Sequence, residues 1–201
     1  MVTAGFADPV AAAQSTFRAI LAATARPGTV NPVEAAVAPP APLSRGAAAL
    51  ALTLCDRSTP VWLDAGLRAT ESVAAWLRFH CGVKIVDRPE AASFAFAVDP
   101  RQLPDFDSFA LGSADYPDRS TTIVLLVDSF HAGPTLVLSG PGIRDRRSFC
   151  AAPLPNDIVE RLAANRKLFP RGVDLLLVCA DAVAALPRSV RLQNKDVPSC
   201  M

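Results

Sequence analysis

The apolar residues near the C-terminal end of the chain form one continuous run, from Val173 to Ala180. Asp174 is the only charged residue in this run, which includes the β-branched Val173 and Val178. A strand with one face in water would alternate apolar and polar residues. The run is about as long as one strand, so it predicts a strand covered on both faces, as in the middle of an α/β sheet.

Helix-like and strand-like patterns alternate along the rest of the chain. The apolar spacing and the capping residues predict helices over residues 9–26, 44–56, 70–80 and 155–168. Strands are predicted over residues 61–63, 83–86, 94–98, 121–127, 135–139, 147–151, 173–180 and 185–192. Short turns join the three strands between 121 and 151, which predicts an antiparallel meander. We expect a three-layer α/β fold, in which a mixed sheet has helices on both faces, formed by a single domain over residues 1–201.

Capping residues define the helix ends. Asp8 precedes Pro9 at the start of the first helix, Ser44 precedes the second, and Gly82 follows the third. In the first helix, one face gathers mostly apolar residues: Val10, Ala13, Phe17, Ile20, Leu21 and Thr24. Residues 31–42 contain four prolines, so we expect an irregular excursion there rather than a helix or a central strand.

Composition excludes several classes of protein. A hydrophobic content of 51% over 201 residues is enough for a substantial core, and a formal charge of +1 provides no large field for nucleic acid or an anionic membrane. No basic residue precedes Arg18, so the charged start of a signal peptide is missing. Five widely spaced cysteines without a Cys-x-x-Cys pair do not suggest a disulfide framework. We expect a cytoplasmic protein.

The Gly140-Pro141-Gly142 element invites comparison with a phosphate-binding loop, because it follows a strand. Such a loop needs a helix directly after the glycines, and here an arginine-rich segment and another strand follow. Pro at the second position and Gly at the third instead predict a type II turn.

Arg144, Arg146 and Arg147 lie beside this turn and could hold a phosphonate or a triphosphate through paired guanidinium groups. The alternative, which short charged runs favour, is a solvated hairpin tip. His80 next to Cys81 is the only dense point for a metal, but neighbouring residues on a helix point about 100° apart. We therefore expect no metal, and we explain His80 by its place at a helix C-terminus.

The candidate acids are Asp56, Asp64 and Asp128, each at the end of an element. Asp128 ends an apolar strand, from which a carboxylate could reach a crevice at the sheet edge, although capping a turn is the commoner use. No nucleophile motif such as Gly-x-Ser-x-Gly is present.

Several motifs together carry a family resemblance. Near the C-terminus these are Phe169-Pro170-x-Gly172-x-Asp174-Leu175 and Leu186-Pro187-Arg188. Earlier in the chain they are Ala13-Gln14 with Phe17-Arg18 and Leu21, Pro27-Gly28, Leu52-Thr53-Leu54 with Asp56, Thr59 to Leu63, Leu77 to His80, and Leu138 with Gly140, Gly142 and Ile143. In this order, from about residue 10 to residue 190, they resemble the PhnH family of the bacterial carbon-phosphorus lyase system for phosphonate breakdown.

The resemblance implies a core similar to that of pyridoxal-phosphate-dependent transferases. Here the lysines, Lys84, Lys167 and Lys195, are poorly placed to hold that cofactor, so we expect no cofactor. The resemblance further implies a subunit of the carbon-phosphorus lyase core complex. That complex forms α-D-ribose 1-methylphosphonate 5-triphosphate from ATP and methylphosphonate, and the subunit would be structural or substrate-organising within it. We then expect no activity without the partner subunits. A stand-alone small-molecule binding module and a degenerate transferase-fold enzyme remain alternatives.

Family members pair as homodimers, and the resemblance implies the same here. Phe106, Phe109, Leu111 and the segment Val33 to Leu43 are the apolar material that we expect to be exposed for this contact. The candidate phosphonate, phosphate or interface residues are Arg144, Arg146, Arg147, Arg188, Asp56 and His80.

Overall fold

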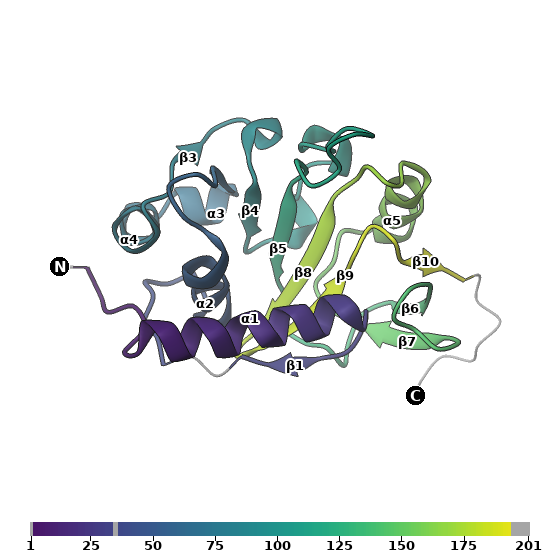
Figure 1. Cartoon of the computed structure of the whole chain (residues 1–201), viewed down its shortest axis with the longest axis horizontal. Helices are drawn as coiled ribbons and strands as arrows, with labels where there is room; N and C mark the ends of the chain where they lie inside the picture. The colour runs from purple at the N-terminus through teal and green to yellow at the C-terminus, as the bar shows by residue number, and fades with distance from the viewer. Residues whose placement is uncertain (1, 34–35, 194–201) are drawn as a thin grey trace.

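The computed structural model describes residues 2–33 and 36–193, and its centre is a seven-stranded sheet in the order β1-β9-β8-β5-β4-β2-β3 (Figure 1). The strands of this sheet are β1 (Asn31–Pro32), β2 (Val61–Leu63), β3 (Ile85–Val86), β4 (Phe94–Ala97), β5 (Thr122–Leu126), β8 (Asp174–Cys179) and β9 (Ala182–Leu186). Strands β3, β2, β4, β5 and β8 are mutually parallel, and β9 is antiparallel to β8 and to β1. Within this sheet, β9 is therefore the one reversed strand.

Side chains from the two faces of the sheet enter two separate hydrophobic clusters. In β8, Leu176 and Val178 belong to one cluster and Leu175 and Leu177 to the other. All four side chains are buried. The prediction that residues 173–180 form a strand covered on both faces is confirmed.

Helices α1 (Pro9–Ala25), α2 (Arg45–Leu54) and α4 (Glu71–Cys81) contribute to the first cluster, and α1 runs across the front of the molecule in Figure 1. The predicted caps are present. Asp8 accepts from the backbone N–H of Ala11, Ser44 accepts from that of Ala47, and Gly82 is left-handed at φ +68°. The short helix α3 (Ala65–Arg68) follows β2.

The second cluster contains α5 (Ile158–Lys167) and a three-stranded antiparallel sheet in the order β10-β6-β7. Its strands are β6 (Thr135–Ser139), β7 (Arg147–Cys150) and β10 (Arg191–Leu192). The single-turn helices η1 (Pro89–Ala91), η2 (Pro100–Gln102) and η3 (Phe106–Ser108) lie between β3 and β5 in the chain. Helices therefore supply both clusters, one on each side of the mixed sheet.

Two strand predictions were wrong. The predicted meander does not form, because β5 pairs in parallel with β4 and β8, and only β6 and β7 form an antiparallel hairpin. An apolar run does not itself choose its partner strand. The predicted strand over 185–192 is divided at Pro187, whose carbonyl accepts from the N–H of Val190 in a turn. Strand β9 ends before this turn, and β10 pairs with β6 instead.

Helix α1 buries a different face from the predicted apolar one. Val10, Phe17 and Leu21 are 79%, 50% and 56% exposed, while Thr16 and Ala23 are buried together with Ile20. Helix α1 packs against α2, whose buried residues are mostly alanine and glycine. Small side chains allow the two helices to approach closely, so the larger side chains of α1 remain on the outside.

The larger apolar side chains that we expected to be exposed are mostly buried, whereas Ala36, Ala38, Ala41 and Pro42 are exposed. Phe106 and Phe109 lie in the second cluster, and Val33, Val37 and Leu43 lie in the first. Their burial shows that the proline-rich excursion and the loop after β4 complete the core. For these five side chains the expectation of an exposed contact surface was wrong, and Glu34 and Ala35 of the same segment lie outside the described residues.

Candidate functional site

The family-like motifs near the C-terminus converge on the guanidinium group of Arg188. Its Nε and Nη2 form a bidentate pair with the carboxylate of Asp174 at the start of β8, and Asp174 also accepts from the backbone N–H of Arg188 at 2.8 Å. The remaining donors reach the carbonyls of Pro117 and Pro170 and the hydroxyl of Ser120. All five N–H bonds of this arginine are thus directed at protein atoms.

Asn165 of α5 holds the turn that precedes β8 through two hydrogen bonds. Its side-chain amide donates to the carbonyl of Val173, and its side-chain oxygen accepts from the N–H of the same residue, both at 2.9 Å. Gly172 sits directly against this amide with φ +122°, and a Cβ there would lie 2.5 Å from the Asn165 oxygen. The turn therefore requires glycine on both conformational and steric grounds. Sequence reasoning missed Asn165, whose position in an amphipathic helix gave no signal.

The arginines of the β6–β7 hairpin lie elsewhere in the structure. The predicted type II turn is confirmed, because Ile143 N donates to Gly140 O at 3.1 Å and Gly142 has φ +78°. Arg144 and Arg146 are exposed. Arg147 points toward the end of α1, where its Nη1 donates to the carbonyls of Arg26 and Pro27.

Asp56 lies in the turn between α2 and β2. Its carboxylate accepts from the hydroxyl and the backbone N–H of Ser58, and these hydrogen bonds hold the pKa of Asp56 below its ordinary value. The six candidate residues therefore lie on four separate parts of the fold: the β8–β9 region, the β6–β7 hairpin, the α2–β2 turn and the end of α4. Their functional roles stay predictions.

His80 contacts the N-terminal segment of the chain rather than only its own helix end. Its Nε2 lies 2.8 Å from the carbonyl oxygen of Thr3, which also accepts from Nε1 of Trp76 at 3.1 Å. Burial raises the pKa of the neighbouring Cys81 thiol to about 11. Within residues 2–33 and 36–193, no group of three or more His, Cys, Asp or Glu side chains is arranged to hold a metal ion.

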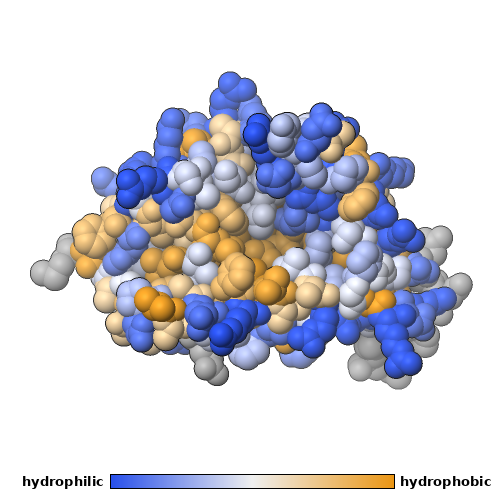
Figure 2. Space-filling view, viewed as in Figure 1, coloured by the Kyte–Doolittle hydropathy of each residue, from blue (hydrophilic) through white to orange (hydrophobic). Residues whose placement is uncertain are grey.

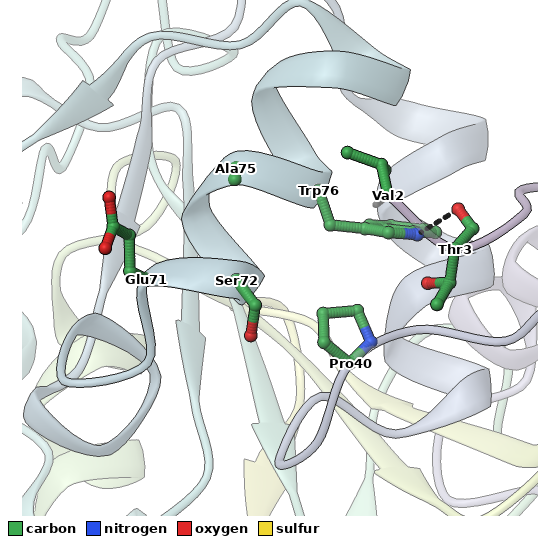
Figure 3. A pocket seen from close by; sticks show the side chains of 7 residues that line it. All are labelled: Val2, Thr3, Pro40, Glu71, Ser72, Ala75 and Trp76. Atoms are coloured by element: carbon green, nitrogen blue, oxygen red, sulfur yellow. Dashed lines mark hydrogen bonds between the residues drawn. The ribbon is translucent and has the colours of Figure 1, made fainter.

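A groove of about 340 Å³ lies beside these residues (Figure 3). Trp76 forms one side of it, with Val2 and Thr3 of the N-terminal segment across its ring and Pro40 and Ser72 nearby (Figure 3). Trp76 itself is only 1% exposed. The N-terminal segment thus already covers the ring of Trp76, which is therefore not available for stacking against a ligand in this groove.

A second cavity, of about 450 Å³, opens at the carboxyl ends of the parallel strands β4, β5 and β8. It is lined by Pro42 and Ser44 before α2, by Val98 after β4, and by residues 126–128 and 178–180 at the ends of β5 and β8. Ligands of open α/β sheets commonly bind in a crevice at this edge. We call this cavity the carboxyl-end crevice.

Asp64 closes the neighbouring part of the same edge. Strand β3 lies next to β2 on one side and β4 lies next to β2 on the other, so the order in which the chain adds strands reverses between β2 and β4. The buried carboxylate of Asp64 fills this point, where it accepts from the backbone N–H groups of Leu67, Val98 and Asp99 at 2.9, 2.7 and 3.1 Å. It ties β2 to β4.

Helix α2 begins directly on the rim of the crevice. Gly46 N donates to the carbonyl of Ala180 at 3.1 Å, and a Cβ on Gly46 would lie 2.5 Å from that oxygen. Arg45 of α2 forms an ion pair with Asp181 in the β8–β9 turn, with 2.8 Å between Nη2 and Oδ2. The positive end of α2 therefore faces the same edge as the carboxylates that follow the strands.

Asp128 carries an exposed carboxylate at the end of β5, as its place in the sequence predicted. The pKa of Arg101 is raised, mainly by its hydrogen bond to Asp99 and further by the negative charge of Asp128. Cys179 donates from Sγ to the carbonyl of Asp128 at 3.2 Å, and burial raises the pKa of its thiol. The thiol is therefore mostly protonated at neutral pH, which suits packing rather than nucleophilic attack.

No lysine is among the residues that line the crevice. Lys84 and Lys167 are exposed elsewhere, and Lys195 and Cys200 lie outside the described residues. No helix of the described ranges is long and apolar enough to cross a membrane. The polar side chains that do meet at the crevice are the carboxylate of Asp128, the hydroxyl of Ser44 and the thiol of Cys179, and the carboxylate and the hydroxyl can bind and orient a polar molecule.

Comparison with known proteins identifies the family. The model of a family described as bacterial phosphonate metabolism protein (PhnH) matches residues 4–193. The α-D-ribose 1-methylphosphonate 5-triphosphate synthase subunit PhnH of Rhizobium meliloti (strain 1021) is 44% identical over 190 residues, or 94% of each chain.

The chain belongs to the PhnH family.

A further relative, a putative C-P lyase subunit protein HtxG of Stutzerimonas stutzeri, is 35% identical over 106 residues, which is 53% of each chain. The resemblance seen in the sequence motifs is confirmed by the family match. In this PhnH-family chain, the motifs Phe-Pro-x-Gly-x-Asp and Leu-Pro-Arg supply the Arg188 network and the Gly172 turn. Their contacts described above are structural.

Replacing Asp174 by asparagine is expected to lower the free energy of unfolding by about 1 to 3 kcal/mol, because Arg188 would lose its charged partner at a site where its side chain is 13% exposed. Thermal or urea unfolding measures the change. Asp115→Asn is the matched control, since Asp115 is exposed and accepts no hydrogen bond from the described residues. An unchanged melting temperature with lost activity of the assembly would instead give Asp174 a functional role.

Proposed function

We propose that this chain is a subunit of a synthase that forms α-D-ribose 1-methylphosphonate 5-triphosphate in phosphonate catabolism. The single observation that carries this proposal is the 44% identity, over 94% of both chains, to a subunit named for that synthase. In the reaction, the bond between ribose C1′ and the adenine of ATP breaks, and a bond between C1′ and a methylphosphonate oxygen forms. Adenine leaves and the triphosphate remains on the ribose.

The geometry of the described residues supports a structural or substrate-organising role for the chain. Asp64 and Arg188 have their polar atoms engaged within the fold, and Cys55 and Cys179 have pKa values raised by burial. The carboxyl-end crevice, with the exposed carboxylate of Asp128 at its edge, is available to a substrate. We assign the organising role to this crevice, where the carboxylate of Asp128 can accept hydrogen bonds from the hydroxyl groups of a ribose.

We further infer a sheet architecture like that of pyridoxal-phosphate-dependent transferases, in a single domain without the cofactor. The mixed seven-stranded sheet with one reversed strand supports the inference, and so does a crevice lined without lysine. The free thiols of Cys55, Cys81, Cys150 and Cys179, the cysteines among the described residues, support a location in the reducing cytoplasm.

The purified chain alone is expected to release no adenine from ATP and methylphosphonate, and to support release when the other synthase subunits are added. Adenine can be measured by chromatography. Two results would contradict the proposal: adenine release by the chain alone, or full activity of the other subunits when the chain is omitted.

Asp128→Asn is expected to raise the KM for ATP of the reconstituted assembly by at least about tenfold, because a charge-assisted hydrogen bond contributes roughly 1.5 to 3 kcal/mol. Steady-state kinetics measures this change. Asp107→Asn, at an exposed residue of η3 outside the crevice, is the matched control. If both variants have the KM of the wild type, the crevice does not organise ATP and a scaffolding role alone remains.

We also propose that the isolated chain is a homodimer that pairs through the apolar ridge of α1, formed by Val10, Phe17 and Leu21. The three residues are spaced by seven and four positions, so they share one face of the helix. Figure 2, in which α1 lies toward the viewer, shows apolar side chains on this side of the molecule. An exposed, self-complementary ridge suits a twofold contact.

Light scattering at micromolar concentration is expected to give the mass of a dimer for the wild type and of a monomer for Phe17→Glu/Leu21→Glu, since charge on the ridge would oppose contact. Val159→Glu, at an exposed apolar residue of α5, is the control and should remain dimeric. A monomeric wild type would contradict the homodimer. A dimeric double variant would place the contact on another surface.

A further inference from the structure

Five arginines from three separate segments gather at one end of the molecule. Arg26 follows α1, Arg144, Arg146 and Arg147 belong to the β6–β7 hairpin, and Arg191 lies in β10 opposite Ser139 of β6. Figure 2 shows strongly hydrophilic side chains at the end of the molecule where β6 and β7 lie. We call these five residues the arginine face.

Specific packing holds the arginine face together. Gly142 at the hairpin tip lies so close to the end of α1 that an added Cβ would be 2.0 Å from the carbonyl oxygen of Ala25. Arg147 fastens the same two segments, because its Nη1 donates to the carbonyls of Arg26 and Pro27 at 3.3 and 3.0 Å. The positive side chains are thus brought together by fixed backbone contacts rather than by a flexible loop.

The charge of this face is not balanced locally. Asp145 is the one acid within the hairpin segment 144–147, and no carboxylate of the described ranges lies within 4.0 Å of any of the five guanidinium groups. Six other arginines are each paired with an acid: Arg45, Arg68, Arg88, Arg101, Arg161 and Arg188. The five arginines and Asp145 carry +4, whereas the whole chain carries +1, so its remaining residues carry −3.

We propose that the arginine face docks an acidic surface of another subunit of the synthase, an inference that rests on the proposed function. An exposed ion pair in water contributes only about 0 to 1 kcal/mol, so a single small anion gains little from exposed guanidinium groups. An extended acidic surface engages several at once and is attracted before contact, which raises the association rate. Arginine is also enriched at protein interfaces over lysine. Arg26, Arg144, Arg146 and Arg191 make the contact, and Arg147 holds the hairpin in place.

The test compares Arg144→Glu/Arg146→Glu with Arg57→Glu/Arg171→Glu, which makes the same change in charge at exposed residues elsewhere. Association with the complex of the remaining synthase subunits, purified without this chain, is measured by biolayer interferometry at 50 and 300 mM salt. Melting temperatures check folding, which neither pair of exposed changes should disturb. We expect the hairpin variant to associate at least about tenfold more slowly at low salt and to lose most of the salt dependence, while the control variant behaves like the wild type.

Equal association of the hairpin variant and the wild type would overturn the inference, and so would an equal loss in the control, since net charge alone would then explain it. Normal association with lost ATP binding by calorimetry would also overturn it, because the face would then be a site for a small anion. If the wild type itself does not associate with the other subunits, the proposed function fails and this inference fails with it. The wild-type trace therefore separates the two failures.

Discussion

The ion pair between Asp174 and Arg188 is the interaction on which the rest of the sheet depends. Asp174 begins β8, the strand that joins the parallel part of the sheet to the reversed β9, and Arg188 follows the end of β9. The same guanidinium reaches the loop before β5 through Pro117 and Ser120 and the turn before β8 through Pro170. The side chain of Arg188 thus fixes the positions of the amino ends of β5 and β8. The carboxyl ends of the same two strands form the crevice.

The motifs that reveal the family and the residues that could meet a substrate lie at opposite ends of these strands. The Phe-Pro-x-Gly-x-Asp and Leu-Pro-Arg segments fix β8 and β9 at one end, while Asp128 and the start of α2 face the crevice at the other. Because one end of these strands is held rigidly, short loops can determine the shape of the crevice at the other end. This division explains how the strongest sequence motifs of the chain can be structural.

The local features of the fold were predictable from sequence, and its long-range pairings were not. Asp8, Ser44 and Gly82 mark helix ends because caps act on backbone groups within a few residues. The type II turn at Gly142 and the doubly covered strand β8 follow from equally local patterns. The partners of β5, the outward ridge of α1 and the burial of Phe106 depend on which segments meet. The candidate site divides in the same way, because Asp128 was visible as a strand end, whereas the link from Arg188 to Asp174 required the register of β8 and β9.

The two edges of the large sheet restrict how this protein can join others. Each outer strand, β1 and β3, is two residues long, and β1 contains Pro32, which offers no backbone N–H. At the edges of the large sheet, a neighbouring chain therefore finds almost no free ladder to extend. Contacts with other subunits must therefore be made by side chains on helices and hairpins. There, single substitutions can change the affinity for a partner without disturbing the backbone. In a multi-subunit enzyme, this arrangement favours assemblies of defined size over open-ended polymers of strands.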